Sequence, residues 1–229
     1  MTKYFDAHCH IINQTPIPKS IGAICNATTQ SDWQSVIDQS ARQTNIWGAI
    51  GIHPWYIDNI KNTWARDLKK VLIDNPGLMI GECGIDKNKN NLDKQIEIFQ
   101  THLAIAHELR RGIHVHCVGA WDVMMRILKQ NQKCLPPFIM FHKYSGNPAD
   151  INRLSNEYNV YFSYHVNASA RRVQATPKDK ILIETDSDSP QNIAEHVKIF
   201  TQKFGNFDFT GNTIRMLENG KTEQNKITV

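Results

Sequence analysis

The chain has 229 residues, of which 41% are hydrophobic, and a formal net charge of +4 at pH 7. This length suits one α/β barrel, which typically needs about 250 residues, and no apolar run approaches the ~20 residues of a membrane span. The mild positive charge permits a polyanionic substrate without arguing for one, and no run of basic residues resembles a nucleic-acid-binding arm.

The N-terminal segment and the cysteines bear on the cellular compartment. Residues 1–6 lack the apolar stretch of a signal peptide. The five cysteines are scattered, odd in number and include no Cys-x-x-Cys pair, which is typical of a reducing compartment. We therefore expect a cytoplasmic protein that does not enter a membrane.

Strand and helix patterns alternate along the chain. Short apolar runs predict eight strands, at residues 4–7, 21–25, 46–52, 78–81, 112–115, 138–141, 160–163 and 181–183. Amphipathic stretches predict helices at residues 31–43, 64–73, 92–106, 123–129 and 193–204. Ser31 is the expected N-cap of the first helix. From Gly220 onward the sequence is polar and has no clear pattern.

Eight strands that alternate with helices indicate a parallel sheet. Eight is also the number of strands that closes a TIM-type (β/α)8 barrel. An open, doubly wound sheet is the alternative, but polar residues follow many of the strands, as they do at the carboxyl end of a barrel. We predict a single α/β barrel domain over residues 1–229, because no linker, repeat or low-complexity segment interrupts the pattern.

The first strand ends in Asp6-Ala7-His8-Cys9-His10. Residues two apart on a strand face the same side, so His8 and His10 should point together while Cys9 points away. Two imidazoles on one face can reach one metal ion, although such a pair is also often structural.

Four further strands are followed by, or end in, a side chain that can ligate a metal. These residues are Glu82 after the fourth strand, His116 at the fifth, His142 after the sixth and Asp186 after the eighth. A barrel gathers its strand ends around one axis, so these groups should converge. Carboxylates and imidazoles suit a divalent cation such as Zn²⁺, Mn²⁺ or Ni²⁺, and suit Mg²⁺ less well.

Six short segments in this order span almost the whole chain and carry a family resemblance. They are Asp6-Ala7-His8-Cys9-His10, Gly51-Ile52-His53-Pro54, Gly81-Glu82-Cys83-Gly84-Ile85-Asp86, Ile113-His114-Val115-His116-Cys117, His142-Lys143-Tyr144-Ser145-Gly146 and Glu184-Thr185-Asp186. Together they resemble the TatD family of metal-dependent hydrolases, within the amidohydrolase-like barrels. The resemblance implies phosphodiester hydrolysis, chiefly of DNA and often from its ends.

The resemblance also implies two divalent metal ions. The first would be held by His8, His10, Glu82 and Asp186, and the second by Glu82, His116 and His142. The expected catalytic residues are Glu82, which would bridge the metals and fix their spacing, and Asp186, which would orient the attacking water. Asp188 shares a face with Asp186 if the strand continues, but Asp186 follows the apolar run directly and matches the family.

Two features depart from the family's pattern. Where the family often has an arginine two residues after the histidine of the fifth strand, this chain has Val118. Residues 187–190 lead almost directly into a helix, whereas many members carry a longer loop with arginine and asparagine. Both departures affect substrate contacts rather than metal binding.

Four residues near strand ends are candidates for substrate contacts: His53, Lys87, Lys143 and His165. His53 should face the rim of the site, with a role in loop structure equally well supported. The two lysines can contact phosphates, or they can simply be solvated. For His165, a role in loop structure is the simpler interpretation.

The remaining histidines and the cysteines have structural interpretations. Cys9, Cys83 and Cys117 each adjoin a proposed ligand, but alternation should turn them outward as packing residues. His114 shares a face with His116 one layer deeper, and we expect a hydrogen-bonded interior histidine. Three others fall on predicted helices as surface or packing residues: His102, His107 and His196.

Two other classes of function remain open. The fold and the metal ions do not by themselves determine which bond is hydrolysed, so a C–N or C–O hydrolase of the amidohydrolase type is one alternative. A catalytically silent binding protein is the other, and the complete ligand set argues against it. The sequence leaves open the metal identity, DNA versus RNA, end versus internal cleavage, and the oligomeric state.

Overall fold

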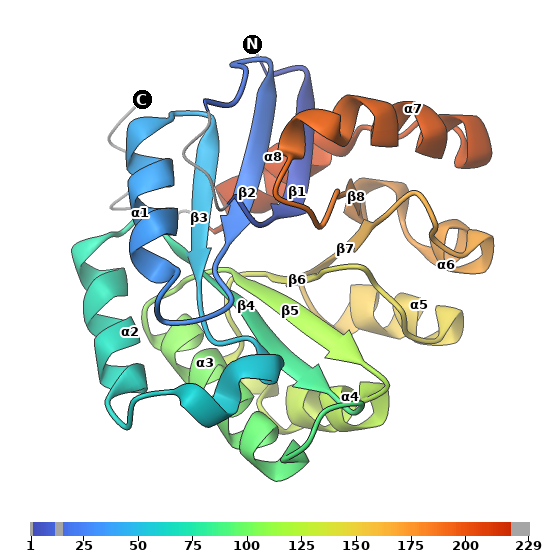
Figure 1. Cartoon of the computed structure of the whole chain (residues 1–229). Coiled ribbons are helices and arrows are strands. Elements are labelled where there is room, and N and C mark those ends of the chain that lie inside the picture. Colours follow the sequence, from blue (N-terminus) through green and yellow to red (C-terminus); the bar gives the residue numbers. More distant parts are fainter. Residues whose placement is uncertain (1, 12–15, 221–229) are drawn as a thin grey trace.

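The computed structural model describes residues 2–11 and 16–220, and its centre is a sheet of eight strands (Figure 1). All neighbouring strands pair in parallel, and their order in the sheet is their order in the chain. The strands are β1 (Tyr4–Cys9), β2 (Ile21–Asn26), β3 (Ile46–Ile50), β4 (Met79–Asp86), β5 (Ile113–Val118), β6 (Ile139–Phe141), β7 (Val160–Tyr164) and β8 (Ile181–Ile183). A doubly wound sheet would reverse its strand order, so that alternative is excluded.

Hydrogen bonds between β1 and the segment after β8 bring the two edges of the sheet together. The backbone N–H of Asp186 donates to the carbonyl of His8 (3.0 Å). The buried carboxylate of Asp6 on β1 accepts hydrogen bonds from the backbone N–H (3.0 Å) and the hydroxyl (2.6 Å) of Thr185. The predicted TIM-type (β/α)8 barrel is therefore confirmed, and its seam lies beside the predicted ligands.

The helices are α1 (Trp33–Arg42), α2 (Trp64–Asp74), α3 (Leu92–Glu108), α4 (Trp121–Gln130), α5 (Pro148–Glu157), α6 (Ala170–Ala175), α7 (Ile193–Phe204) and α8 (Phe209–Asn219). In the described part of the chain, α1 to α6 each connect two successive strands from β2 to β8, α7 and α8 follow β8, and the helices lie around the barrel in Figure 1. The sequence pattern does not predict α5, α6 or α8. The first two bury few side chains, namely Ile151 and Leu154 in α5 and Val173 in α6. Across residues 2–11 and 16–220, no helix combines the length and apolar content needed to cross a membrane.

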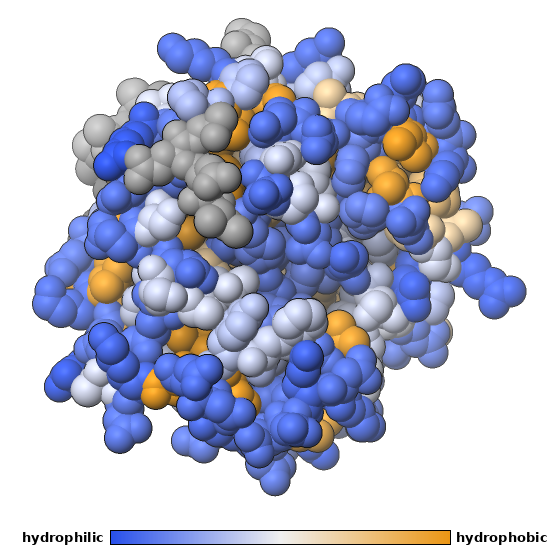
Figure 2. Space-filling model, in the orientation of Figure 1, coloured by the Kyte–Doolittle hydropathy of each residue, from blue (hydrophilic) through white to orange (hydrophobic). Residues whose placement is uncertain are grey.

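The barrel has an inner and an outer apolar layer. The inner layer consists of Phe5, Ala7, Ile24, Ala49, Met79, Met140, Tyr161 and Leu182 from the strands, with Phe138 directly before β6 and Met216 from α8. The outer layer joins the other faces of the strands to the helices. Figure 2 shows hydrophilic residues over most of one face of the molecule, with hydrophobic residues in small separate patches. The hydrophobic core therefore lies within and around the barrel, and the predicted ligands lie at the carboxyl ends of the strands.

Three strands extend by two or more residues beyond their predicted ends. β1, β4 and β5 continue to Cys9, Asp86 and Val118. Glu82 and His116 therefore lie within strands rather than past them. The predicted strands end where the apolar runs end. At this end of the barrel the inward-facing residues are polar but still buried, so the hydrogen bonds between strands continue past the apolar runs.

The first helix begins two residues later than predicted, at Trp33, and the N-cap is Asp32 rather than Ser31. The Asp32 carboxylate accepts hydrogen bonds from the backbone N–H groups of Thr28 (3.2 Å) and Thr29 (3.0 Å). These bonds fix the turn that enters the helix, which Ser31, at an exposed position, does not do. At the other terminus, the predicted polar tail beyond Gly220 lies outside the described residues.

His102 of α3 is a packing residue, fully buried and fixed in one neutral tautomer. Its Nε2 accepts the backbone N–H of Ile52 (3.2 Å), and its Nδ1–H donates to the carbonyl of Ile98 (2.8 Å). The imidazole thereby ties α3 to the segment after β3. Burial lowers the pKa of His102 from 6.5 to about 4.

We expect His102 to make the folded state less stable in acid. The folded protein keeps this imidazole neutral while the unfolded chain takes up a proton below pH 6.5, so the stabilisation is complete above pH 6.5 and is lost as the pH falls toward 4. Between pH 7 and pH 5 the wild type should lose roughly 2 kcal/mol more than His102→Gln, measured by urea unfolding. An equal loss in both proteins would contradict this account.

Candidate metal centre

A cavity of about 620 Å³ opens at the carboxyl ends of the strands. Five of the six predicted ligands line it: His10, Glu82, His116, His142 and Asp186. The sixth, His8, has no exposed surface and lies directly behind Glu82. Residues more than 170 positions apart in the sequence therefore meet because the barrel is closed.

Glu82 of β4 is at the centre of this cluster and is 2% exposed. Its Oε2 lies 3.2 Å from Nε2 of His8 and 3.3 Å from Nε2 of His10. The two imidazoles of β1 therefore point together, as alternation predicts, while Cys9 packs in the outer core.

The other carboxylate oxygen of Glu82 faces a second set of imidazoles. Oε1 lies 2.9 Å from Nδ1 of His116, 2.9 Å from Nε2 of His142 and 3.1 Å from Nε2 of His53. One carboxylate thus stands between two groups of nitrogen donors, one on each of its oxygens. That is the geometry required of a bridging ligand.

Several ring nitrogens also face one another directly. Nε2 of His8 and Nε2 of His10 are 3.2 Å apart, and Nδ1 of His116 lies 3.1 Å from Nε2 of His142. A pair of imidazole nitrogens at this distance can share one proton at most, whereas a cation satisfies both lone pairs. Five imidazoles and two carboxylates with no thiolate fit a borderline divalent metal ion.

Asp186 completes the first set. Its Oδ1 lies 3.4 Å from Nε2 of His10 and 3.9 Å from Nε2 of His8, and its Oδ2 accepts a hydrogen bond from Nζ of Lys143 (2.8 Å). Asp188 is exposed, and its carboxylate accepts a hydrogen bond from the hydroxyl of Ser189 (3.1 Å). The structure therefore places Asp186, and not Asp188, against the imidazoles.

Three of the imidazoles have an oxygen close to their outer nitrogen, as a hydrogen-bond partner for His10 and His116 and as an ion-pair contact without hydrogen-bond geometry for His142. Nδ1 of His10 lies 2.9 Å from the carbonyl of Asn26, Nε2 of His116 lies 3.4 Å from Oδ2 of Asp86, and Nδ1 of His142 lies 3.4 Å from Oε1 of Glu184. Partners of this kind orient the ring of a ligating histidine and select its tautomer.

The sequence analysis assigned no role to Asp86 or Glu184. The available signal was alternation: Asp86 is four residues after Glu82 on the same strand, and Glu184 is two residues before Asp186. Glu184 is fully buried and also accepts a hydrogen bond from the hydroxyl of Ser163. Each of these carboxylates lies beside the nitrogen of an imidazole that faces away from Glu82.

The electrostatics of the cluster favour ionised carboxylates around positive charge. Burial alone raises the pKa of Glu82, but the surrounding imidazoles of His142, His8 and His53 hold it well below its usual value. Burial likewise raises the pKa of Asp186, but the hydrogen bond from His10 and the Lys143 ammonium hold it far below its usual range. Both carboxylates are therefore anionic at neutral pH, as ligands must be.

The four predicted substrate contacts divide into two pairs. His53 and Lys143 line the cavity, although His53 is 5% exposed and lies among the imidazoles rather than at the rim. Lys87 and His165 are not among the lining residues. The ring of His165 packs edge-on against His196 instead, with centroids 4.8 Å apart, which agrees with its simpler, structural interpretation.

The interior residues follow the predicted alternation with one correction. Cys83 and Cys117 are buried in the outer core, and Cys117 also borders the cavity. His114 is fully buried, but within residues 2–11 and 16–220 neither of its ring nitrogens has a hydrogen-bond partner. The expected hydrogen bond is absent because His114 stacks on the ring of His8 (6.1 Å between centroids) and packs edge-on against Phe138, below the polar layer.

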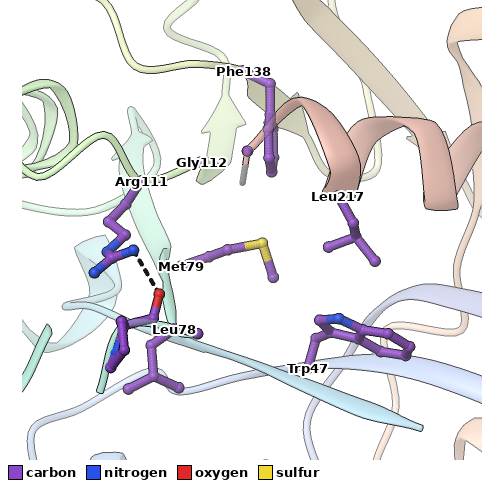
Figure 3. Close-up of a pocket in the computed structure, with 10 residues that line it drawn as sticks. Trp47, Leu78, Met79, Arg111, Gly112, Phe138 and Leu217 are labelled. Atoms are coloured by element: carbon purple, nitrogen blue, oxygen red, sulfur yellow. Dashed lines mark hydrogen bonds between the residues drawn. The ribbon is translucent and has the colours of Figure 1, made fainter. Parts of the chain in front are cut away.

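A second cavity, of about 230 Å³, lies at the amino-terminal end of the barrel (Figure 3). Its labelled apolar side chains are Trp47, Leu78, Met79, Phe138 and Leu217. Arg111 borders it, but its guanidinium donates hydrogen bonds to the backbone carbonyls of Pro76 (2.5 Å) and Leu72 (3.3 Å). The Arg111 guanidinium therefore stabilises the backbone at this end of the barrel. The cluster of imidazoles and carboxylates lies at the opposite end.

Comparisons with known proteins agree on one family. The family model described as TatD related DNase matches residues 5–195. A human protein named 3'-5' RNA nuclease TATDN2 is 24% identical over 221 residues, which cover 80% of this chain and 28% of that protein. An Erwinia billingiae protein named 3'-5' ssDNA/RNA exonuclease TatD is 27% identical over 150 residues, which cover 62% of this chain and 57% of that protein. The matches thus span less than two thirds of either relative.

Solved structures show the same barrel. The chain is similar to the crystal structure of YJJV, a TatD homolog from Escherichia coli k12, with a TM-score of 0.79 and 17% identity over 95% of this chain and 96% of that one. A TatD family hydrolase from Entamoeba histolytica gives a TM-score of 0.75 and 14% identity, with the same coverage of both chains. At these identities the likeness is one of fold.

Proposed function

The chain belongs to the TatD-related DNase family of metal-dependent hydrolases, and on that premise we propose that it hydrolyses phosphodiester bonds of nucleic acid with two divalent metal ions. The observation that carries this proposal is the position of Glu82, with one oxygen toward each set of imidazoles. A single-metal site would need only one such set. In-line displacement at phosphorus suits two metals, because the attacking and leaving oxygens both develop charge.

The donor atoms define two proposed metal sites. The proposed ligands of the first are His8, His10, Glu82 and Asp186, and those of the second are Glu82, His116 and His142. In support, ligand atoms of His8, His10 and Glu82 lie within 4.8 Å of one another, and so do those of His53, Glu82 and His116. His53 is not added as a ligand, because its Nδ1 accepts the backbone N–H of Trp55 and its Nε2 therefore carries a proton, which faces Oε1 of Glu82. Zn²⁺, Mn²⁺, Ni²⁺ and Mg²⁺ are the candidate ions, with Mg²⁺ the poorest match to this many imidazoles.

The reaction needs an activated water and a neutralised phosphate. When bound, the two cations would polarise a phosphoryl oxygen and lower the pKa of the attacking water. Asp186, with 20% of its side chain exposed to the cavity, orients that water and accepts its proton. The Lys143 ammonium beside it adds positive charge where the phosphate enters. Glu82, which is shielded from solvent, holds the metals and takes no part in proton transfer.

We propose single-stranded ends of DNA as the substrate, with RNA as the nearest alternative. The names of the two relatives support cleavage from a 3' end, and a splayed single strand can enter the mouth of a barrel more easily than a stiff duplex. Val118 lines the cavity where many family members have an arginine. Phosphate contacts should therefore be few, and binding should weaken as salt rises.

The proposal predicts metal content and activity together. Protein purified without chelator should carry up to two divalent metals per chain by elemental analysis. Removing them with EDTA should abolish turnover of end-labelled single-stranded DNA, and adding back Mn²⁺, Zn²⁺, Ni²⁺ or Mg²⁺ in turn should restore it. The panel also includes duplex DNA, single-stranded RNA, a generic phosphodiester, amides and lactones.

Two outcomes of this experiment would favour the alternatives. Metal-dependent cleavage of an amide or lactone without phosphodiester turnover would identify an amidohydrolase-type enzyme. Absence of bound metal, of a thermal shift on adding metal and of any turnover would identify a silent binding protein.

The proposal extends to the whole chain and its compartment. We propose that residues 1–229 form one barrel unit, supported by α8, whose Met216 packs in the inner core after the last strand. All five cysteines are free and four are buried, which supports a reducing compartment such as the cytoplasm.

A further inference from the structure

Two large aromatic side chains are exposed at the mouth of the metal-centre cavity. Trp55 is 51% exposed and Tyr56 is 40% exposed, and both line the cavity. Across the described residues the other exposed large hydrophobic side chains are Ile73 and Ile214, and neither lines that cavity. Exposed aromatic surface concentrated at a site, rather than scattered, indicates a binding role.

The backbone ties both rings to the donor cluster. Their helix, η1 (Pro54–Asn59), begins directly after His53, whose Nδ1 accepts the backbone N–H of Trp55 (3.2 Å). The opposite nitrogen of the same imidazole, Nε2, lies 3.1 Å from Oε1 of Glu82. The position of the rings relative to the reacting phosphate is therefore set by one residue of the cluster.

The indole ring of Trp55 is also held in place by its own hydrogen bond. Its Nε1–H donates to Oδ2 of Asp86 (2.6 Å), and the same oxygen lies 3.4 Å from Nε2 of His116. A ring that is half exposed yet fixed loses little freedom when a ligand stacks on it. The Lys89 ammonium lies over one face of the ring, 4.3 Å from its centroid, so positive charge accompanies the aromatic surface and a base that stacks on that face displaces the ammonium.

We propose that Trp55 and Tyr56 form a stacking platform for the unpaired nucleobases beside the scissile phosphate, with Lys89 near the phosphate backbone. This inference rests on the proposed function and extends it to substrate recognition. Stacking on an aromatic ring accepts any base, whereas the bases of a duplex already stack on one another. The platform therefore selects single strands without regard to sequence.

The cavity continues past the platform. Tyr56 also lines a neighbouring cavity of about 590 Å³, which shares His10 and Thr28 with the metal-centre cavity. Tyr56 thus borders both spaces, where successive nucleotides of a strand would pass. A platform at that position contacts the nucleotides next to the cleaved bond rather than distant ones.

The test measures binding separately from cleavage. The metal-loaded protein is titrated against a fluorescent single-stranded oligonucleotide with nuclease-resistant phosphorothioate linkages, and anisotropy gives the Kd. Trp55→Ala and Tyr56→Ala should each raise the Kd roughly 5- to 100-fold. Trp55→Phe and Tyr56→Phe, which keep a ring, should recover most of the affinity, and Ile214→Ala should match the wild type. An oligonucleotide with abasic residues at its end should bind the wild type and the alanine variants equally.

Each outcome either supports or contradicts the proposed stacking platform. Unchanged Kd values in both alanine variants, or equal losses on intact and abasic strands, overturn it. Trp55 contacts Asp86, which in turn contacts His116, so elemental analysis checks that each variant keeps its metal. If Trp55→Ala loses metal, the Kd values of Tyr56→Ala and of the phenylalanine variants test the platform instead. If binding depends on the bases and on the two rings but no phosphodiester is cleaved, the platform is supported and the proposed function is wrong. If phosphodiesters are cleaved but binding does not depend on the rings, the proposed function is supported and the platform is wrong.

Discussion

Replacing Asp186 with asparagine should abolish hydrolysis while leaving the protein folded. The change removes a negative charge from between His10 and Lys143, and with it a proposed metal ligand that is also the proposed acceptor for the proton of the water. A loss of roughly 10²- to 10⁴-fold is typical for a general base alone, and loss of a ligand adds to it. Steady-state cleavage of single-stranded DNA and a thermal melt measure the two effects.

Asp188→Asn is the matched control for this prediction. The residue is two positions away, is exposed and has no contact with the imidazoles among the hydrogen bonds and ion pairs of the described residues. Its substitution should leave turnover within about two-fold of the wild type, as for most surface changes. If Asp188→Asn is the inactive variant and Asp186→Asn is active, the assignment of the ligand after β8 is wrong by two residues.

Replacing Glu82 with glutamine should remove both proposed metals at once. One oxygen faces His8 and His10 and the other faces His53, His116 and His142, so the substitution removes the negative charge that the two sets of imidazoles share. The variant should show no bound metal by elemental analysis and no measurable turnover. It should also lose the thermal shift on adding Mn²⁺ or Zn²⁺, because binding to the folded state alone produces that shift.

The control for this experiment is Glu97→Gln, which makes the same chemical change at an exposed position of α3. It should keep the metal content and thermal shift of the wild type. Retention of one metal per chain by Glu82→Gln would show that the carboxylate serves a single site, and the two-metal arrangement would then have to be abandoned. A circular dichroism spectrum confirms that the variant is folded.

Much of the fold and most of the donor cluster could be predicted from the sequence alone. Strand and helix periodicities are local, so eight strands in alternation with helices were visible before any contact was known. His8 and His10 share a face because the side-chain period of a strand is two. Glu82, His116, His142 and Asp186 stand out because each interrupts or follows an apolar run, where a polar side chain needs a reason to be buried.

Other features were decided only when distant segments came together. The sequence predicts that His53 faces the rim, because nothing near it in the sequence shows that its Nε2 lies 3.1 Å from Oε1 of Glu82. Asp86 became a partner of His116 and of Trp55 only through contacts 30 and 31 positions apart. The exposure of Trp55 beside the cavity is likewise a property of the folded surface, because an aromatic residue in a sequence is more often core.

The sequence by itself thus determined the barrel class and the chemical nature of the site, because both follow from periodicities and from polar residues at fixed places along strands. The tertiary structure decided which oxygen of Glu82 faces which imidazole, which residues orient the ring nitrogens, and which aromatic rings reach the cavity. The physical reason is range: backbone patterning acts over a few residues, whereas the closure of the sheet, seen where the N–H of Asp186 meets the carbonyl of His8, positions side chains across the entire chain.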